Sequence, residues 1–327
     1  MGNIVRWGII GCGKIAQKFA LDLALCGSGI LIACSSRDEK RAIEFSLQHN
    51  VEKYFTDYHL LANCPDIDAV YIATPHSHHY VHTLLSLDAN KAVLCEKPLT
   101  VNEALGQKVI EVALKKNCLL MEAMWTAFLP SIQEIKSKIE HGIIGEVRHL
   151  RADFGFKAEI ENNSRLLFPL LAGGSLLDIG IYPLFISIFL MGVPEDVVAC
   201  GHLSGTGVDD ECTIMLKFKN GATAVLYSSF TIHTDTKCEI FGTKGKISIP
   251  TRFHEQNNYS IHFANGKNEH FETDKKGYGY SYEIEHFNQC LISGLKESPV
   301  MTYNMSLDIL RIMDSVRKQI GLKYIWD

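Results

Sequence analysis

The sequence lacks several features that mark other classes of protein. It contains no run of five like charges, and its 32 basic and 37 acidic residues give a net charge of −5. A protein that binds nucleic acid normally carries a basic face, and anionic membranes attract the same sign of charge. The composition therefore argues against nucleic acid and membrane surfaces as partners.

The ten cysteines never form a C-x-x-C pair, which argues against a zinc ribbon or a thioredoxin-like motif. Several of them, such as Cys34 and Cys95, lie inside apolar runs typical of strands. We interpret them as reduced, buried thiols, which points to a reducing compartment and a cytoplasmic location.

The sequence also lacks the patterns typical of a signal peptide and of a membrane-spanning segment. The N-terminal apolar run leads straight into a glycine turn, without the cleavage pattern of a signal peptide. The longest uncharged stretch, residues 179–194, is shorter than the ~18 residues of a membrane span and contains Pro183, so we expect a buried helix of the core.

The length of 327 residues exceeds the ~250–300 at which one core usually stops growing, so we expect two domains. Residues 1–124 alternate wholly apolar runs with helical patterns, which predicts a Rossmann domain with a parallel sheet covered on both faces. The expected strands are 5–10, 30–35, 69–73, 91–95 and 118–121, and the expected helices are 14–25, 38–49, 76–89 and 101–117.

Residues 125–327 predict an α+β domain with a largely antiparallel, open-faced sheet for substrate binding and dimerisation. Its C-terminal helix could pack back on the first domain. A first strand is expected at 146–154, and several more between 197 and 271, in particular at 213–218, 222–230, 238–241 and 246–249. Helices are expected at 131–141, 174–190, 281–294 and 306–320. In 222–230, Val225, Tyr227 and Ser229 alternate with Ala224, Leu226 and Ser228, and one of these faces could pair with a second subunit.

A glycine-rich motif, Gly11-x-Gly13-x-x-Ala16, directly follows the first predicted strand. Gly11 permits a tight turn, Gly13 lets a pyrophosphate approach the backbone, and Ala16 keeps helix and strand close. The N–H groups at Lys14 and Ile15 open the helix and can bind phosphate. The motif predicts a dinucleotide site.

The residues after the second strand bear on the choice of cofactor. NAD enzymes usually have an acidic residue there for the ribose 2′-hydroxyl, whereas this chain has Ser36 and Arg37, with Arg41 one helical turn later. A guanidinium can bind a 2′-phosphate, so we expect NADP. The alternative is that Asp38 binds the ribose of NAD.

Two further clusters suggest a reaction site. Glu96, Lys97 and Pro98 end the fourth strand, and ligands of open α/β sheets lie beyond the carboxyl ends of strands. Lys97 could stabilise an alkoxide there, or could be a surface lysine. Asp178 and Tyr182 are four residues apart on a predicted apolar helix, so they share a face; they are either substrate-binding groups or a satisfied pair in the core.

Three histidines follow the third strand with a spacing of three residues. His76, His79 and His82 could suggest a metal site, but neither cysteine nor carboxylate accompanies them, and we expect no metal. Their position favours another interpretation, a role near the cofactor, because the turn that begins at Thr74 follows the third strand and borders the cofactor site.

Together these motifs resemble the glucose–fructose oxidoreductase/inositol dehydrogenase (Gfo/Idh/MocA) family, and most closely its branch of dimeric dihydrodiol dehydrogenases, which also act as NADP-dependent D-xylose dehydrogenases. The resemblance covers nearly the whole chain. Further segments that carry it are 121–126 (Met-Glu-Ala-Met-Trp-Thr), 207–210 (Gly-Val-Asp-Asp), 242–245 (Gly-Thr-Lys-Gly) and 281–283 (Ser-Tyr-Glu).

The resemblance implies that Lys97 and Tyr182 flank the nicotinamide and the reacting carbinol, and that the Lys97–Pro98 peptide is cis. It also implies a homodimer, cofactor contacts from Thr74, His76 and Glu96, and substrate contacts from Asp178, His79 and Trp125. We therefore expect an NADP-dependent dehydrogenase of a sugar or a trans-dihydrodiol. The alternatives are an inositol or anhydro-sugar dehydrogenase and a non-catalytic dinucleotide sensor.

Overall fold

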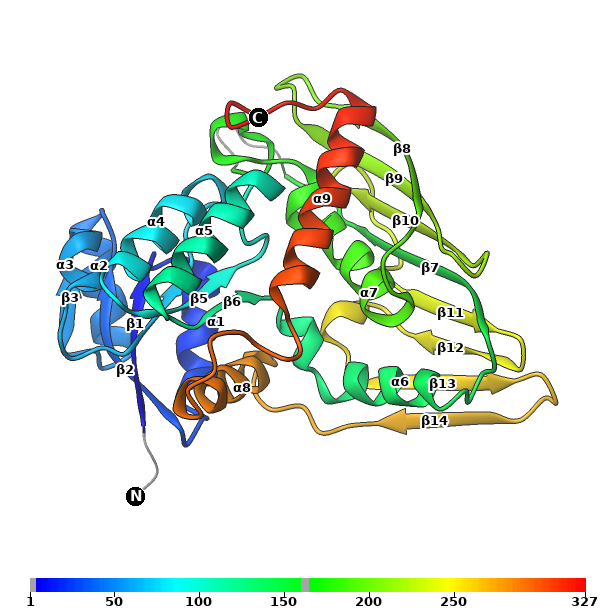
Figure 1. Ribbon diagram of the computed structural model, residues 1–327, viewed down its shortest axis with the longest axis horizontal. Coiled ribbons are helices and arrows are strands. Elements are labelled where there is room, and N and C mark those ends of the chain that lie inside the picture. The colour runs from blue at the N-terminus through cyan, green and yellow to red at the C-terminus, as the bar shows by residue number, and fades with distance from the viewer. Residues whose placement is uncertain (1–3, 160–164) are drawn as a thin grey trace. The chain divides into compact units, whose positions relative to one another are not determined.

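The computed structural model describes residues 4–159 and 165–327 (Figure 1). These residues pack into two compact units, each of which is described by itself. The first comprises the chain up to Phe128 together with Lys275–Leu307, and the second comprises Leu129–Asp274 and Asp308–Asp327. The predicted domain boundary at residue 124 stays a prediction. In the structure the chain leaves the first unit after Phe128 and contributes to it again from Lys275 to Leu307.

The first unit is built on a parallel sheet of strand order β3-β2-β1-β4-β5-β6. This is the doubly wound dinucleotide-binding order, and it confirms the predicted Rossmann fold. Its strands are β1 (Val5–Ile10), β2 (Gly29–Ser35), β3 (Lys53–Phe55), β4 (Ala69–Ile72), β5 (Ala92–Glu96) and β6 (Leu120–Ala123). Its helices are α1 (Lys14–Leu23), α2 (Glu39–Gln48), α3 (Tyr58–Ala62), α4 (His76–Asp88), α5 (Glu103–Lys116) and α8 (Tyr280–Ile292), with the first residues of α9 (Tyr303–Ile320).

Burial explains why the parallel strands could be recognised in the sequence. All residues of β4, β5 and β6 are buried, so these strands read as continuous apolar runs. The short elements β3 and α3 were not predicted, because three and five residues are too few to show a periodicity.

Helix α8 packs on α1 and completes the core of the first unit. Its N-terminus is capped by the carboxylate of Asp22 in α1, which accepts hydrogen bonds from the backbone N–H groups of Tyr278, Tyr280 and Ser281 at 2.9, 2.8 and 3.2 Å. Farther along α8, the Asn288 amide oxygen accepts the indole N–H of the fully buried Trp7 at 3.0 Å. A segment that follows the second sheet in the sequence, Lys275–Leu307, thus supplies part of the first unit's core.

The second unit is built on a sheet of strand order β14-β13-β12-β11-β7-β10-β9-β8. Within the described chain its neighbours are antiparallel except for the parallel pair β7–β10, as the prediction of a largely antiparallel sheet requires. The strands are β7 (Val147–Gly155), β8 (Asp196–Leu203), β9 (Asp209–Lys217), β10 (Thr223–Ser229), β11 (Cys238–Gly242), β12 (Gly245–Ile249), β13 (Asn258–Phe263) and β14 (Asn268–Glu272).

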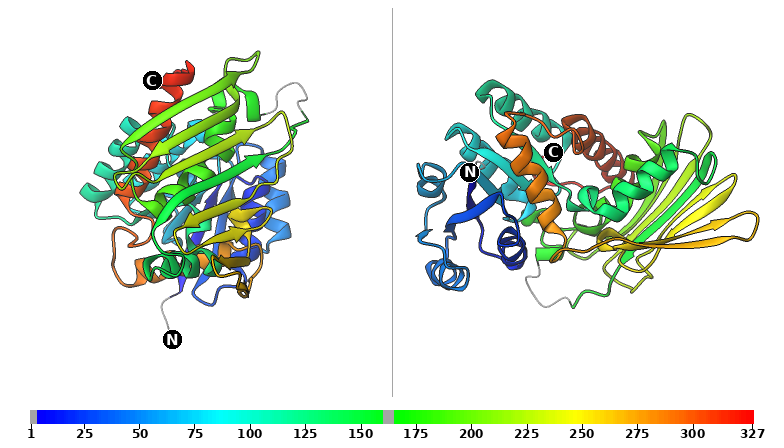
Figure 2. Two further views of the ribbon diagram at one scale, coloured as in Figure 1. Left: turned by 90° about the vertical axis from the view of Figure 1, so that its right-hand side faces the viewer. Right: turned by 90° about the horizontal axis from the view of Figure 1, so that it is seen from below.

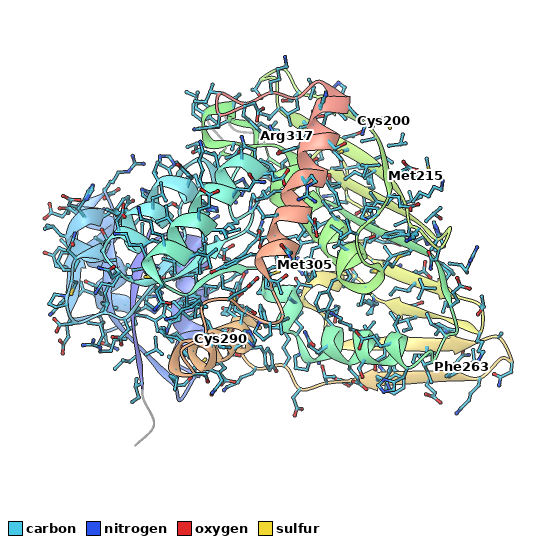
Figure 3. The ribbon with its side chains drawn as sticks, in the orientation of Figure 1. Cys200, Met215, Phe263, Cys290, Met305 and Arg317 are labelled. Atoms are coloured by element: carbon cyan, nitrogen blue, oxygen red, sulfur yellow. The ribbon has the colours of Figure 1, made fainter. Side chains whose placement is uncertain are left out.

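One face of this sheet is covered by helices and the other is open, as the left panel of Figure 2 shows. Helix α7 (Ile181–Met191) packs on β7 and β10, and α6 (Pro130–Glu140) packs on α7. On the open face Val198, Met215 and Val225 are direct neighbours across three strands, with exposed fractions of 56, 49 and 39%. The exposed Cys200 and Met215 are labelled in Figure 3.

The predicted alternation in β10 holds at Val225 and Tyr227 but fails at Ser229, which is buried. The reason is local: the backbone N–H groups of Thr231 and Ile232 fold back to donate hydrogen bonds to the Ser229 hydroxyl, at 3.0 and 3.3 Å.

The predicted helix 174–190 is present but begins as a π-turn, Leu176–Gly180, before continuing as α7. By length and composition Pro169–Met191 could cross a membrane, yet 89% of its most apolar stretch is buried inside the protein. The expected core helix is therefore what the structure shows.

Candidate active site

The turn after β1 has the geometry that a dinucleotide needs. Gly11 has φ of +97°, and a Cβ there would lie 2.8 Å from the carbonyl oxygen of Ala73, so only glycine fits. At Gly13 the direction of a Cβ meets no described atom within 4 Å. A pyrophosphate could therefore approach this backbone.

The N-terminus of α1 offers the complementary donors. Gly13 is its N-cap, and no described side chain caps the helix by a hydrogen bond. Ala16 is fully buried, which keeps the helix against β1, while Lys14 is exposed and Ile15 half-buried. Uncapped N–H groups and the positive end of the helix dipole form a site suited to phosphate.

Arg37, which follows β2, lines a cavity of about 730 Å³ in the first unit, whose other lining residues belong to α3, α4 and the chain next to these helices. Arg37 lines it together with Tyr58 and His82, among others. Asp38 is engaged elsewhere: it caps α2 by accepting the Arg41 N–H at 3.1 Å, and its carboxylate lies 3.8 Å from the Arg41 guanidinium. Ser36 is buried. This leaves Arg37 as the cation at the cavity, with Asp38 committed to the helix.

Lys97 follows β5 in a backbone segment that is fixed on several sides. The Lys97–Pro98 peptide is cis, as the resemblance implied. The Glu96 carboxylate accepts the hydroxyl of Tyr71 and, at 3.2 Å, the N–H of Lys97. Leu99, which follows Pro98, donates its N–H to the Glu122 carboxylate at 2.9 Å. These bonds hold the Lys97 backbone at the carboxyl edge of the sheet.

His79 lies beneath this segment, and its two ring nitrogens contact backbone carbonyl oxygens, of Pro98 at 2.7 Å and of Thr74 at 2.9 Å. Burial lowers the pKa of its imidazole to about 3, against the raising effect of these two carbonyl oxygens. A neutral imidazole has a single N–H, so it can donate a hydrogen bond to only one of them. His79 is 0% exposed and links two turns, so in the described structure its ring presents no exposed atom to a substrate. The nearby His76 is nearly buried, with its ring 5.7 Å from that of His79.

Two buried carboxyl groups near Lys97 were not anticipated. Burial raises the pKa of Glu122 to about 7 and that of Glu283 well above its ordinary value. Both Glu283 oxygens lack a hydrogen-bond partner among the described residues. The segments that carry these residues were noticed in the sequence, but their burial leaves no local pattern. Trp125 is also almost buried and stacks on Tyr280, with ring centroids 4.6 Å apart.

In the second unit the π-turn and α7 carry Asp178 and Tyr182. The guanidinium of Arg165 lies 3.4 Å from the Asp178 carboxylate. The Tyr182 ring packs beside Phe154 and His254, with centroid distances of 5.8 and 4.9 Å, in an aromatic cluster that sequence reasoning missed. Its members come from β7, α7 and the loop after β12, so no sequence spacing links them.

The predicted site residues thus form two sets. The first unit holds, at the carboxyl ends of its strands and in the segments that follow them, Gly11, Gly13, Lys14, Ile15, Ala16, Ser36, Arg37, Arg41, Thr74, His76, His79, Glu96, Lys97 and Trp125. The second unit holds Asp178 and Tyr182. That Lys97 and Tyr182 meet at one substrate stays a prediction. Among the described residues, no group of three His, Cys, Asp or Glu side chains is placed to hold a metal ion.

The Rossmann sheet and its open glycine turn define a dinucleotide-dependent enzyme class. Residues 5–124 match the oxidoreductase family with an NAD-binding Rossmann fold, and residues 132–248 match the GFO/IDH/MocA C-terminal domain. The chain belongs to this oxidoreductase family, as the sequence motifs predicted, and is an NAD(P)-dependent oxidoreductase.

Relatives of known name agree with this assignment. The chain is 38% identical to a trans-1,2-dihydrobenzene-1,2-diol dehydrogenase of Xenopus tropicalis, with 98% of this chain and 99% of the relative covered. It is 36% identical to the Bos taurus enzyme of the same name, with 99% of each chain covered.

Solved structures show the same fold over nearly the full length. A 3-ketoreductase from Actinomadura kijaniata, in complex with NADP and TDP-benzene, is 27% identical with a TM-score of 0.88, over 97% of this chain and 98% of that one. An aldose–aldose oxidoreductase from Caulobacter crescentus, complexed with glycerol, is 25% identical with a TM-score of 0.88, over 98% of each chain.

Proposed function

We propose that this protein is an NADP-dependent dehydrogenase that oxidises a carbinol of a sugar or of a trans-dihydrodiol. The observation that carries the proposal is the fixed segment around Lys97 at the carboxyl edge of the dinucleotide-binding sheet. The dihydrodiol dehydrogenases among the relatives and the sugar-related enzymes among the solved structures support the substrate class.

In the proposed reaction the bound nicotinamide supplies the hydride acceptor, and residues of this chain handle the proton and the substrate's hydroxyl groups. Tyr182 removes the proton of the reacting hydroxyl, and the Lys97 ammonium stabilises the phenolate and the developing alkoxide. Asp178 accepts a hydrogen bond from a neighbouring hydroxyl, since a carboxylate held by Arg165 has a fixed direction.

NADP is proposed over NAD because of the residues after β2. Arg37 borders the cavity, while the Asp38 carboxylate caps α2 and pairs with Arg41. A ribose 2′-phosphate would form an ion pair with the Arg37 guanidinium. The 2′-hydroxyl of NAD usually binds an acidic residue at this position, but here the Asp38 carboxylate already caps α2.

The first test is a screen of turnover at 340 nm with NADP and NAD against xylose, glucose, inositols and a benzene dihydrodiol. Turnover of inositols or anhydro sugars alone would move the substrate class to that alternative. Cofactor binding without turnover of any of them would indicate a dinucleotide sensor.

The second test concerns the proposed catalytic residues. We expect Lys97→Met and Tyr182→Phe each to lower kcat/KM by about 10²–10⁴-fold, the usual effect of a positioned proton-transfer group. Solved structures of the 3-ketoreductase include variants in one lysine and one tyrosine, the same residue types. Lys115→Met, on the exposed side of α5, is the matched control and should be fully active. Full activity of Lys97→Met would remove that residue from the mechanism.

A homodimer formed through the open face of the second sheet is also proposed. The row Val198, Met215 and Val225 is an apolar strip on a face that none of the described helices of its unit covers. A cytoplasmic location is proposed because all ten cysteines are free and Cys200 is the exposed one. Light scattering and cell fractionation test these two points.

A further inference from the structure

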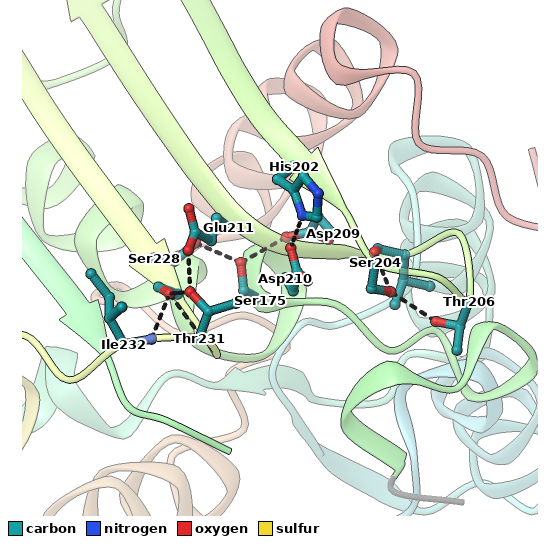
Figure 4. A network of polar contacts seen from close by, with 12 residues as sticks. Ser175, His202, Ser204, Thr206, Asp209, Asp210, Glu211, Ser228, Thr231 and Ile232 are labelled. Carbon is teal, nitrogen blue, oxygen red and sulfur yellow. Dashed lines mark hydrogen bonds and ion pairs between the residues drawn. The ribbon is translucent and has the colours of Figure 1, made fainter. Parts of the chain in front are cut away.

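The helix that carries Asp178 and Tyr182 is held at its start by a buried carboxylate from another element. Asp209, the first residue of β9, accepts a hydrogen bond from the Ser175 hydroxyl at 2.7 Å (Figure 4). The same oxygen, Oδ2, accepts the Leu176 N–H, also at 2.7 Å. These donors are at the beginning of the π-turn. Asp209 is therefore a helix cap supplied from a distant part of the sequence.

Two glycines allow the π-turn to lie this close to the sheet. Gly174 has φ of +129°, and a Cβ there would lie 2.2 Å from the Asp209 Oδ1 atom. At Gly180 a Cβ would lie 2.9 Å from the Ser228 hydroxyl oxygen of β10. The Ser228 hydroxyl also lies 3.0 Å from the Ser175 hydroxyl, so both ends of the turn lie against Ser228 of β10.

The C-terminal segment of the chain also contacts the backbone just before this turn. The hydroxyl of Tyr324, near the end of the chain, donates a hydrogen bond to the carbonyl oxygen of Gly173. The turn is thus fixed by β9, β10 and the C-terminal segment. A π-helical turn is a rare, wider turn that is often found at functional sites. It persists only where contacts with the surrounding structure stabilise it.

Asp209 is fully buried, and its Oδ1 atom has no hydrogen-bond partner among the described residues. Burial raises its pKa to about 6, against the lowering effect of its bonds to Ser175 and Leu176, so the group is mostly ionised above neutral pH. A buried carboxylate is costly unless it has a favourable partner, and the positive end of the helix is one.

We propose that Asp209 is a positioning residue for the reaction: its carboxylate fixes the π-turn so that Asp178 and Tyr182 reach the substrate in one geometry. This inference rests on the proposed roles of those two residues. It adds a residue that touches neither substrate nor cofactor but sets the direction of two that do.

The test is steady-state kinetics of Asp209→Ala and Asp209→Asn, with NADP binding measured separately by fluorescence titration. Asparagine keeps an acceptor oxygen for Ser175 and Leu176 but loses the charge; alanine loses both. We expect Asp209→Ala to lower kcat by about 10- to 100-fold and to raise the substrate KM, since small displacements of reacting groups cost that much. The Kd of NADP should stay within about twofold, and Asp209→Asn should recover part of kcat.

Ser187→Ala is the matched control. Ser187 is buried in α7, downstream on the same helix, and its hydroxyl has no hydrogen-bond partner among the described residues, so its removal should leave kcat and KM unchanged. If Asp209→Ala does not fold, Ser175→Ala removes one of the two bonds and should show the same effect in milder form.

Wild-type kcat and KM in a folded Asp209→Ala protein would overturn the proposal. So would a loss of NADP binding in parallel with turnover, because that is the result of a general loss of structure. Tyr182→Phe, assayed beside them, separates the two levels. If it is fully active, the proposed role of Tyr182 in the reaction fails, whereas if it is inactive and Asp209→Ala is normal, only the positioning role of Asp209 fails.

Discussion

The cap that Asp22 gives to α8 predicts a large loss of stability from a single substitution. In Asp22→Ala, three backbone N–H groups lose a shared carboxylate acceptor. Tyr280 and Ser281 are 4% and 0% exposed, so water cannot replace the lost partner at these two positions without opening the structure.

The size of the effect follows from these contacts. A buried donor left without a partner costs roughly 1–3 kcal/mol; at about 1.5 kcal/mol each, the two buried N–H groups together give about 3 kcal/mol. A change of this size corresponds to a fall in Tm of about 6–12 °C for a unit of this size. In Asp22→Asn the amide oxygen keeps part of the bonding, and we expect about half the loss.

The assay is thermal and urea unfolding followed by tryptophan fluorescence, because Trp7 and Trp125 both contact residues of α8. Asp57→Ala is the matched control: it removes an exposed cap with one hydrogen bond, to His59, and should cost about 1 kcal/mol. If Asp22→Ala is no more destabilised than this control, the buried cap does not stabilise α8 as argued.

Three further predictions concern the cofactor, the pH dependence of stability and assembly. Arg37→Ala should weaken NADP binding by about 10- to 100-fold and leave NAD unchanged, the loss of one charged contact, measured by fluorescence titration; equal losses for both would contradict a 2′-phosphate contact. Folding raises the pKa of Glu122 from 4.5 to about 7, so the native state binds more protons in this window and stability falls as pH rises through it. Glu122→Gln should therefore be more stable than the wild type by about 3 kcal/mol at pH 8, with no difference at pH 4, in urea titrations; a gain that does not change with pH would rule out the protonation argument. Met215→Glu should convert the proposed dimer to monomers in light scattering, because it places a charge in the centre of an exposed apolar strip; an unchanged mass would exclude this face.

The parts of the fold that could be predicted are those with a local pattern. The strands β1, β4 and β5 of the Rossmann sheet are almost wholly buried, so they were found within a residue or two of their ends. The glycine motif was interpretable because it directly follows an apolar strand, and because Gly11 has a positive φ and a close backbone contact that only glycine tolerates.

The parts that could not be predicted depend on residues far apart in the sequence. Asp22 caps a helix more than 250 positions away, and Asp209 caps one that precedes it by 33. A cap of this kind leaves no signature beside the helix that it stabilises. The π-turn is another example: Gly174 and Gly180 flank it, but the spacing alone is equally compatible with an ordinary helix.

The return of Lys275–Leu307 to the first unit has a consequence for how the protein is made. When a ribosome has released only the first 128 residues, the nascent chain holds every strand of the nucleotide-binding sheet but lacks α8, so Trp7 has no Asn288 to bond and Asp22 has no helix to cap. Completion of this half must wait until nearly the whole chain has been synthesised, contrary to the usual order in which N-terminal domains fold first. A fragment ending at residue 128 should therefore be a poor substitute for the intact enzyme in cofactor binding.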